Sequence, residues 1–183
     1  EELGGWRVHA EVSGLADQVV DTDEQAIDAI KRFLSYLPAN HNLPPPVAPV
    51  PPGSDDAIRD VLSILPEKSN QVYDVKKVIR AIFDKDSMFE LKSRFGKTLV
   101  TALARLNGRS VGVIANNPLH KGGAIDVDAC LKAQNMFVLC DSFNIPIILL
   151  VDQPGFLIGM EGEQKGVTGK VMNWLNEIGR AHV

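Results

Sequence analysis

The spacing of hydrophobic residues changes several times along the chain, and each change predicts a new structural element. Residues 3–20 contain a period-two run, Val8, Ala10 and Val12, which predicts strand material. A helix is predicted next, because apolar residues recur three and four positions apart until Pro38. Its residues are Thr22 and Gln25 at capping-box spacing, followed by the apolar positions Ala26, Ile27, Ile30, Phe33, Leu34 and Leu37.

Prolines then interrupt all regular patterns. Seven of the eleven prolines lie in residues 38–52, which predicts a stiff extended linker between two folded parts. Two short helices are predicted beyond it, one after Ser54 and Asp55 and one after Asp74, with Pro66 between them.

The second half of the chain begins with a β-hairpin. Two β-rich runs, TLVTALARL and SVGVIA, are joined by Asn107-Gly108, a dipeptide typical of two-residue hairpin turns. A polar loop with sequence NNPLHKGGAIDVD leads into a predicted helix that ends before Ile145-Pro146. Its predicted apolar positions are Val127, Cys130, Leu131, Phe137, Val138 and Cys140.

A buried parallel strand is predicted after this helix. The run IILLV at 147–151 is apolar without alternation, as expected of a strand covered on both faces. A glycine-containing loop from Asp152 to Gly166 follows, and a further helix is predicted to start near Val167. The order strand, strand, helix, strand, helix predicts an α/β fold built as a spiral of ββα units. Strict βαβ alternation and its GxGxxG motif are not present.

Composition and charge narrow the possible functions. The formal net charge is −4 and no basic block offsets it, which argues against nucleic-acid binding. No apolar run approaches the roughly 20 residues of a membrane span, so we expect a cytoplasmic protein. Cys130 and Cys140 lack metal-binding or disulfide spacing and are predicted to be buried, reduced thiols. The four histidines have no metal-ligand spacing, so no metal site is expected.

The loop after the predicted hairpin is the first candidate site. Ligands in α/β sheets gather at the carboxyl ends of strands, and this loop carries five consecutive residues of interest there: His120, Lys121, Gly122, Gly123 and Ala124. The glycines let backbone approach a ligand closely, and free amides could stabilise an anionic oxygen. An ordinary connection that needs positive φ explains the glycines equally well.

The loop after the predicted parallel strand is the second candidate. Asp152, Pro154, Gly155 and Phe156 follow the strand directly, and the Pro-Gly pair predicts a turn. The Asp152 carboxylate either faces the mouth of a site or only caps this loop.

Several stretches, taken in order, resemble one enzyme family. They are LGG-x3-H-x3-SG from Leu3 to Gly14, DEQAIDAIKRFLSYLP, YDVKKVI, ARLNGRSVGVIANNP, GGAIDVDACLKAQNMFVLCDSFNIPIILLVDQPGF and the trailing G-x-E. Together they resemble the carboxyltransferase subunit, or beta chain, of propionyl-CoA and related biotin-dependent acyl-CoA carboxylases, over about residues 3–177. The resemblance implies a partial crotonase-like fold.

The resemblance also divides the chain. Residues 1–37 would be the end of a first carboxyltransferase domain, 38–53 the linker, and 54–177 the beginning of a second domain. The family's acyl-CoA loop and the GGAY-like helix start would lie outside this sequence, so we expect this chain alone to be inactive. Residues 178–183 look like a non-native tail.

By this resemblance, the protein would move a carboxyl group from carboxybiotin to the α-carbon of propionyl-CoA or acetyl-CoA through an enolate. Biotin would arrive on a separate carrier, and Gly122, Gly123 and Ala124 would line the biotin side. The resemblance leaves His120, Lys121, Asp152, Pro154, Gly155 and Phe156 as candidate substrate-binding residues. Expected partners are biotin carboxylase, the biotin carboxyl carrier protein and further copies of the subunit.

Three alternatives remain open at this point. The chain could belong to the carboxyltransferase subunit of a biotin-dependent decarboxylase or transcarboxylase. It could be a non-catalytic assembly module, or it could belong to a hydratase-like crotonase enzyme.

Overall fold

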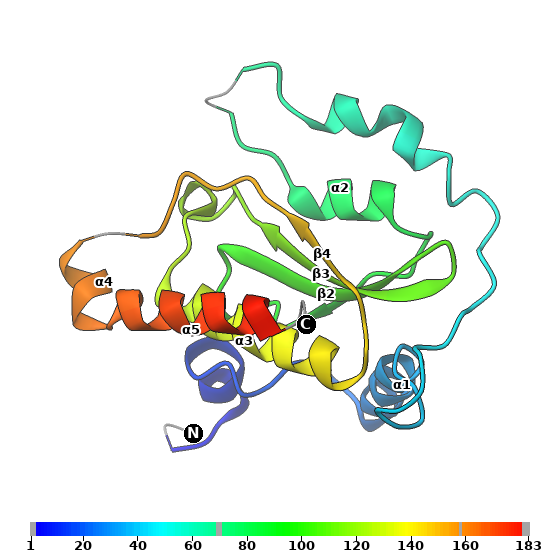
Figure 1. Ribbon diagram of the computed structural model, residues 1–183, viewed down its shortest axis with the longest axis horizontal. Helices are drawn as coiled ribbons and strands as arrows, with labels where there is room; N and C mark the ends of the chain where they lie inside the picture. The colour runs from blue at the N-terminus through cyan, green and yellow to red at the C-terminus, as the bar shows by residue number, and fades with distance from the viewer. Residues whose placement is uncertain (1–2, 69–70, 158, 181–183) are drawn as a thin grey trace.

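The computed structural model describes residues 3–68, 71–157 and 159–180, which form a four-stranded sheet with helices on both faces (Figure 1). The strand order is β1-β2-β3-β4. The first three strands are antiparallel neighbours, and β4 runs parallel to β3. The bounds are Phe89–Leu91 for β1, Leu99–Leu106 for β2, Arg109–Asn116 for β3 and Ile147–Leu150 for β4.

The predicted β-hairpin is confirmed. Asn107 and Gly108 join β2 to β3 with φ values of 51° and 78°, so both turn residues adopt the left-handed conformation that a type I′ turn needs. Asp84, a buried residue, accepts hydrogen bonds from the amides of Asn107 (2.9 Å) and Gly108 (2.7 Å). The linker contacts the same turn, because the Ala48 amide donates to the Gly108 carbonyl at 2.9 Å.

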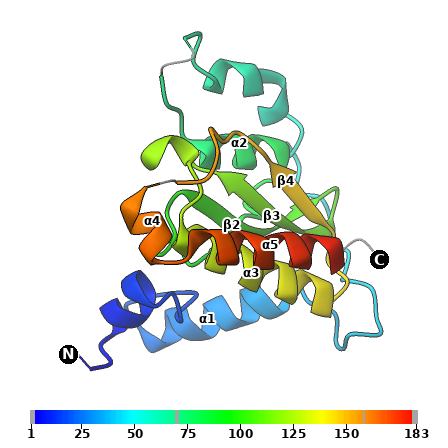
Figure 2. The same ribbon diagram turned by 60° about the vertical axis from the view of Figure 1, so that its left-hand side comes forward.

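Alternate residues of the strands pack into two separate cores. Val100, Ala102 and Val113 face α2, Val75–Ile82, whose first turn is capped by the Asp74 side chain. On the other face, the sheet packs against three further helices, with α3 next to the sheet (Figure 2). These helices are α1 (Asp23–Leu34), α3 (Val127–Ser142) and α5 (Val167–Arg180).

The strand material predicted around Val8, Ala10 and Val12 is wrong. Residues Val8–Val12 form a single π-helical turn, η1, which the Ser13 amide closes by donating to the Val8 carbonyl at 2.9 Å. The chain that follows passes beside β1 without regular pairing, with the Asp17 carbonyl accepting from the Lys92 amide at 2.9 Å. Three alternating residues were too short a pattern to specify a strand.

The first predicted helix is confirmed as α1, although it ends at Leu34 rather than at Leu37. Thr22 caps it by accepting from the Gln25 amide at 3.2 Å, and the Gln25 side chain accepts from the Asp21 amide at 2.9 Å. Its buried side differs from the predicted stripe. Ala29, Phe33 and Leu37 pack against the core, whereas Ile27, Ile30 and Leu34 are exposed.

The remaining helix predictions are confirmed with two corrections. The two short helices are η2, a 3-10 helix at Ala57–Ile64, and α2, and α5 begins at Val167 as predicted. In α3, Val138 is exposed, against the prediction. The loop predicted for 152–166 contains a short helix, α4, at Met160–Gln164.

The expectation that β4 is covered on both faces is confirmed only in part among the described residues. Its residues are half-buried and Leu149 is exposed. Ile147 packs against the core on the α3 side, and Ile148 and Leu150 pack against the core on the α2 side. The coverage is incomplete because β4 is the outermost of the described strands and lies at the margin of both cores.

Residues from several of the predicted segments pack into one hydrophobic core. Tyr36, from the segment predicted to end a first domain, is 1% exposed and lies in the same hydrophobic core as α3. Ile178, from the predicted non-native tail, also packs against this core. Residues 181–183 lie outside the described residues.

Three ionisable groups are buried in α3. Cys130 and Cys140 are free and buried, as predicted, and burial raises the pKa of Cys130 to about 11 and that of Cys140 to about 12. Lys132 is 1% exposed and donates to the carbonyls of Phe95 (3.0 Å) and Leu99 (2.8 Å), which fixes α3 to the start of β2. Burial lowers the pKa of Lys132 to about 8.

Candidate functional site

The two candidate loops leave the sheet side by side. Parallel strands end at the same edge of a sheet, and here Ala115 of β3 is paired with Leu150 of β4. Beyond the strands the loops meet again, because the Ile125 amide donates to the Gly155 carbonyl (3.1 Å) and the Leu157 amide donates to the Ile125 carbonyl (2.8 Å). The two predicted sites are therefore parts of one surface.

The first loop contains a left-handed turn. Lys121, Gly122 and Gly123 have successive φ values of 50°, 63° and 80°. The Gly123 amide donates to His120 O at 2.9 Å, and the Ala124 amide donates to Lys121 O at 3.2 Å. Of the three amides predicted to bind an oxyanion, that of Gly122 alone has no acceptor among the described residues.

The two glycines of this turn have different surroundings. A Cβ at Gly123 would lie 3.0 Å from the Asp152 carbonyl oxygen, so this glycine is needed where the two loops touch. At Gly122 a Cβ would meet no described atom within 4 Å. The Gly122 amide therefore belongs to an exposed and open part of the turn.

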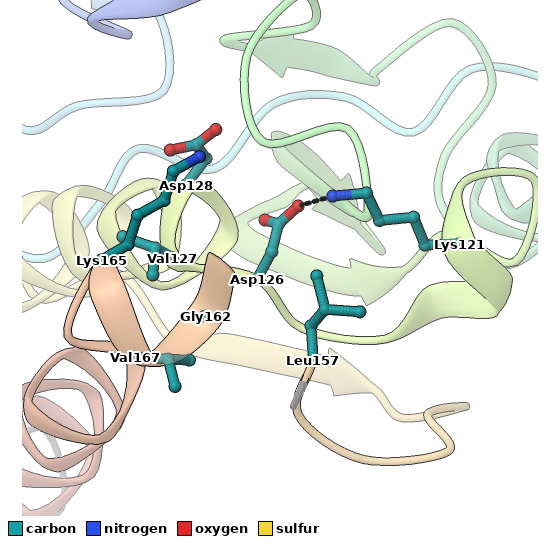
Figure 3. A pocket seen from close by; sticks show the side chains of 8 residues that line it. All are labelled: Lys121, Asp126, Val127, Asp128, Leu157, Gly162, Lys165 and Val167. Carbon is teal, nitrogen blue, oxygen red and sulfur yellow. Dashed lines mark hydrogen bonds and ion pairs between the residues drawn. The ribbon is translucent and has the colours of Figure 1, made fainter. Parts of the chain in front are cut away.

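The side chain of Lys121 forms an ion pair with Asp126 and does not extend over the glycines. Its Nζ lies 3.0 Å from Asp126 Oδ2 (Figure 3). Asp126 also caps α3 by accepting a hydrogen bond from the Ala129 amide. This ion pair lines a small cavity of about 70 Å³, toward which Leu157 extends from the second loop (Figure 3). His120 is exposed beside the turn.

Asp152 is bonded through both its backbone and its side chain. Its carboxylate accepts the Tyr73 hydroxyl at 2.7 Å, and its amide donates to Asn116 Oδ1 at 3.2 Å. Burial, followed by the hydrogen bond and the negative charge of Asp152, raises the pKa of Tyr73 to about 12. The carboxylate thus has a protein partner, which favours a bracing role within the loop.

The rest of the second loop points toward α5. Pro154 is exposed, and Gly155, at φ 139°, supplies the carbonyl that pairs with Ile125. The Phe156 ring packs edge-on against Trp174, with ring centroids 6.1 Å apart. These two rings help to line an apolar cavity of about 180 Å³ between β4 and α5.

Sequence reasoning missed two side chains that join the loops to the fold, Asn116 and Tyr73. Asn116 Nδ2 donates to the Gly123 carbonyl at 3.0 Å, so its amide group bonds to both loops. A polar residue that ends the apolar run SVGVIA was an available signal for Asn116. No comparable signal existed for Tyr73, because 79 positions separate it from Asp152.

The arrangement of strands and strand-end loops defines an α/β protein whose two candidate loops lie at one edge of the sheet. The family model of the carboxyl transferase domain matches residues 1–183. The chain belongs to this family.

Two curated relatives agree with this assignment. The uncharacterized carboxylase YngE of Bacillus subtilis (strain 168) is 40% identical over 169 residues, covering 91% of this chain and 32% of the relative. The propionyl-CoA carboxylase carboxyltransferase subunit of Haloferax mediterranei is 41% identical over 169 residues, with the same coverage of both chains. The chain thus spans about a third of the length of these relatives.

Solved structures agree on the fold. Transcarboxylase 12S, solved with hydrolysed methylmalonyl-coenzyme A bound, matches with a TM-score of 0.93 and 37% identity, covering 100% of this chain and 36% of that chain. A single-chain, multi-domain long-chain acyl-CoA carboxylase matches with a TM-score of 0.84 and 33% identity, covering 98% of this chain and 18% of that chain. The fold is therefore that of the crotonase-like carboxyltransferases, as predicted.

Among the residues that the structure describes, no helix has the length and apolar character needed to cross a membrane.

Proposed function

We propose that this sequence is part of the carboxyltransferase of a biotin-dependent acyl-CoA carboxylase, which carboxylates the α-carbon of propionyl-CoA or acetyl-CoA. The observation that carries the proposal is the left-handed turn at Lys121–Gly123, which leaves the Gly122 amide without a described acceptor at the strand-end surface. Membership of the carboxyl transferase family and likeness to propionyl-CoA carboxylase subunits support it.

The turn fits a carbonyl oxygen that gains negative charge. Carboxylated biotin would release its carboxyl group as CO2 when the N–carboxyl bond breaks, and the ureido nitrogen freed by this cleavage would accept the α-proton of the thioester. The resulting enolate carbon would then attack the CO2. The Gly122 amide would donate to the ureido oxygen, because Gly122 is exposed and its amide has no acceptor among the described residues. One such donor contributes roughly 3 kcal/mol to the stability of a transition state.

The carrier and the other partners follow from the same proposal. We expect biotin to be presented by a biotin carboxyl carrier protein that is loaded by biotin carboxylase, and several copies of the subunit to assemble in the cytoplasm. The hexamer assembly of the transcarboxylase 12S relative supports the expectation of a homo-oligomer. Its 37% identity also keeps a transcarboxylase or decarboxylase subunit as the second candidate.

The test uses a full-length protein that contains this sequence, supplied with carboxylated carrier and radiolabelled carboxyl group. Gly122→Val would add a branched side chain next to this amide and disfavour the left-handed turn, and we expect carboxyl transfer to propionyl-CoA to fall about 100-fold. Gly166→Val is the matched control, because Gly166 has φ 68° and no described atom lies within 4 Å of its Cβ position. Equal activity of the two variants would remove the Gly122 turn from the active site.

A further inference from the structure

Asn116 ends β3 as a buried polar residue. It is 4% exposed and lies opposite Leu99 in the register of β2 and β3. Burying a side-chain amide is unfavourable unless both its donor and its acceptor are bonded. Here the donor Nδ2 bonds the Gly123 carbonyl at 3.0 Å and the acceptor Oδ1 bonds the Asp152 amide at 3.2 Å.

The two partners of Asn116 fix both the orientation and the identity of this side chain. The Gly123 carbonyl can only accept and the Asp152 amide can only donate, so the nitrogen must face Gly123 and the oxygen must face Asp152. An ionised aspartate has no donor for the carbonyl, and leucine has neither group. An asparagine amide meets both requirements from one short, planar side chain.

The two hydrogen bonds of Asn116 hold the Gly123 loop and the Asp152 loop in contact with each other. Gly123 and Asp152 follow different strands, yet a Cβ at Gly123 would lie only 3.0 Å from the Asp152 carbonyl oxygen. Holding the Gly123 carbonyl fixes the peptide plane that follows Gly123 in the left-handed turn. The Gly122 amide lies two peptide units earlier in the same turn, so a turn that is held at the Gly123 carbonyl also limits the direction of that amide.

We propose that Asn116 is a positioning residue for carboxyl transfer, which sets the Gly122 amide relative to the Asp152 loop without touching substrate. This inference rests on the proposed function of the turn. Asn117 offers a matched control, because it is also buried, at 5% exposed, and its Nδ2 donates to the Lys97 carbonyl at 2.9 Å. That bond fixes the approach to β2 and reaches neither Gly123 nor Asp152.

The kinetic test compares Asn116→Leu, Asn116→Asp and Asn117→Leu in the full-length protein, each alongside its melting temperature. We expect both Asn116 variants to lower kcat by about 30-fold or more while KM for the acyl-CoA changes less than about threefold, because a displaced donor acts on the transition state. Asn117→Leu should lower the melting temperature comparably and keep kcat within about threefold. An unchanged kcat in folded Asn116→Leu, or an equal kcat loss in Asn117→Leu, would overturn the proposal.

Hydrogen exchange separates this proposal from the proposed function. In the same proteins, Asn116→Leu should speed exchange of the Asp152 amide by at least about tenfold, and Asn117→Leu should not change it. Unchanged Asp152 exchange in Asn116→Leu would refute the link between the loops whatever the enzyme does. Faster exchange in a protein whose wild type transfers no carboxyl group would keep the link and reject the proposed function.

Discussion

Adding a single methyl group at the hairpin turn tests how the linker is attached to the sheet. Gly108 has φ 78°, and a Cβ there would lie 2.2 Å from the Ala48 carbonyl oxygen. Gly108→Ala must therefore adopt an unfavourable backbone conformation and also push the linker away. The displacement would break the 2.9 Å hydrogen bond from the Ala48 amide to the Gly108 carbonyl.

The expected loss can be estimated from these contributions. A non-glycine residue in the left-handed region costs about 1 kcal/mol. Losing one backbone hydrogen bond costs about 1 kcal/mol, and incomplete relief of the collision adds on the order of 1 kcal/mol. We therefore expect Gly108→Ala to lower the free energy of unfolding by about 3 kcal/mol.

Urea unfolding followed by circular dichroism measures this loss. Gly166→Ala is the control, since Gly166 has a similar φ of 68° without a described atom within 4 Å of the added methyl. It should lose only about 1 kcal/mol, from backbone conformation alone. Equal losses in the two variants would show that the contact between Ala48 and Gly108 does not stabilise the protein.

Two further substitutions test buried and partly buried polar groups. The pKa of Lys132 is lowered to about 8 from an ordinary value of 10.5, so the unfolded chain binds more protons between these pH values and stability should rise with pH there, by at most about 1.4 kcal/mol per pH unit. Lys132→Met should lack this rise, and identical pH profiles of unfolding for wild type and variant would contradict the assignment. Tyr73→Phe removes the donor to Asp152 and should lower the melting temperature, with a loss of about 1 kcal/mol in unfolding free energy. An unchanged melting temperature would mean that this hydrogen bond does not brace the Asp152 loop.

Local patterns predicted the elements that local chemistry specifies. Asn107-Gly108 predicted its hairpin because the turn requires positive φ at both residues, and Thr22 predicted the start of α1 because its hydroxyl satisfies a free helix amide. Strand β1 was missed since its three residues, Phe89–Leu91, become a strand only by pairing with β2. The run at Val8–Val12 failed for the converse reason, because no neighbouring strand pairs with it in the described structure.

In the candidate site, too, local sequence predicted some features, and others depend on residues far apart in the chain. Glycines and a strand end located the turn at Lys121–Gly123, and the Asp152 loop was found by the same reasoning. Which amide of the turn stays free depends on hydrogen bonds within the folded loop, which spacing alone does not reveal. The bridge made by Asn116 joins positions 7 and 36 residues away, so it exists only once β3 and β4 are side by side.

Carboxyl transfer by a full-length protein containing this sequence is the most direct test of the central claim. Carboxylated biotin carrier and either propionyl-CoA or acetyl-CoA would be incubated with wild type, Gly122→Val and Gly166→Val, and labelled methylmalonyl-CoA or malonyl-CoA would be measured. We expect transfer by wild type and Gly166→Val, with about a 100-fold loss in Gly122→Val. No transfer by the folded wild type to propionyl-CoA or acetyl-CoA, or full transfer by Gly122→Val, would contradict this expectation.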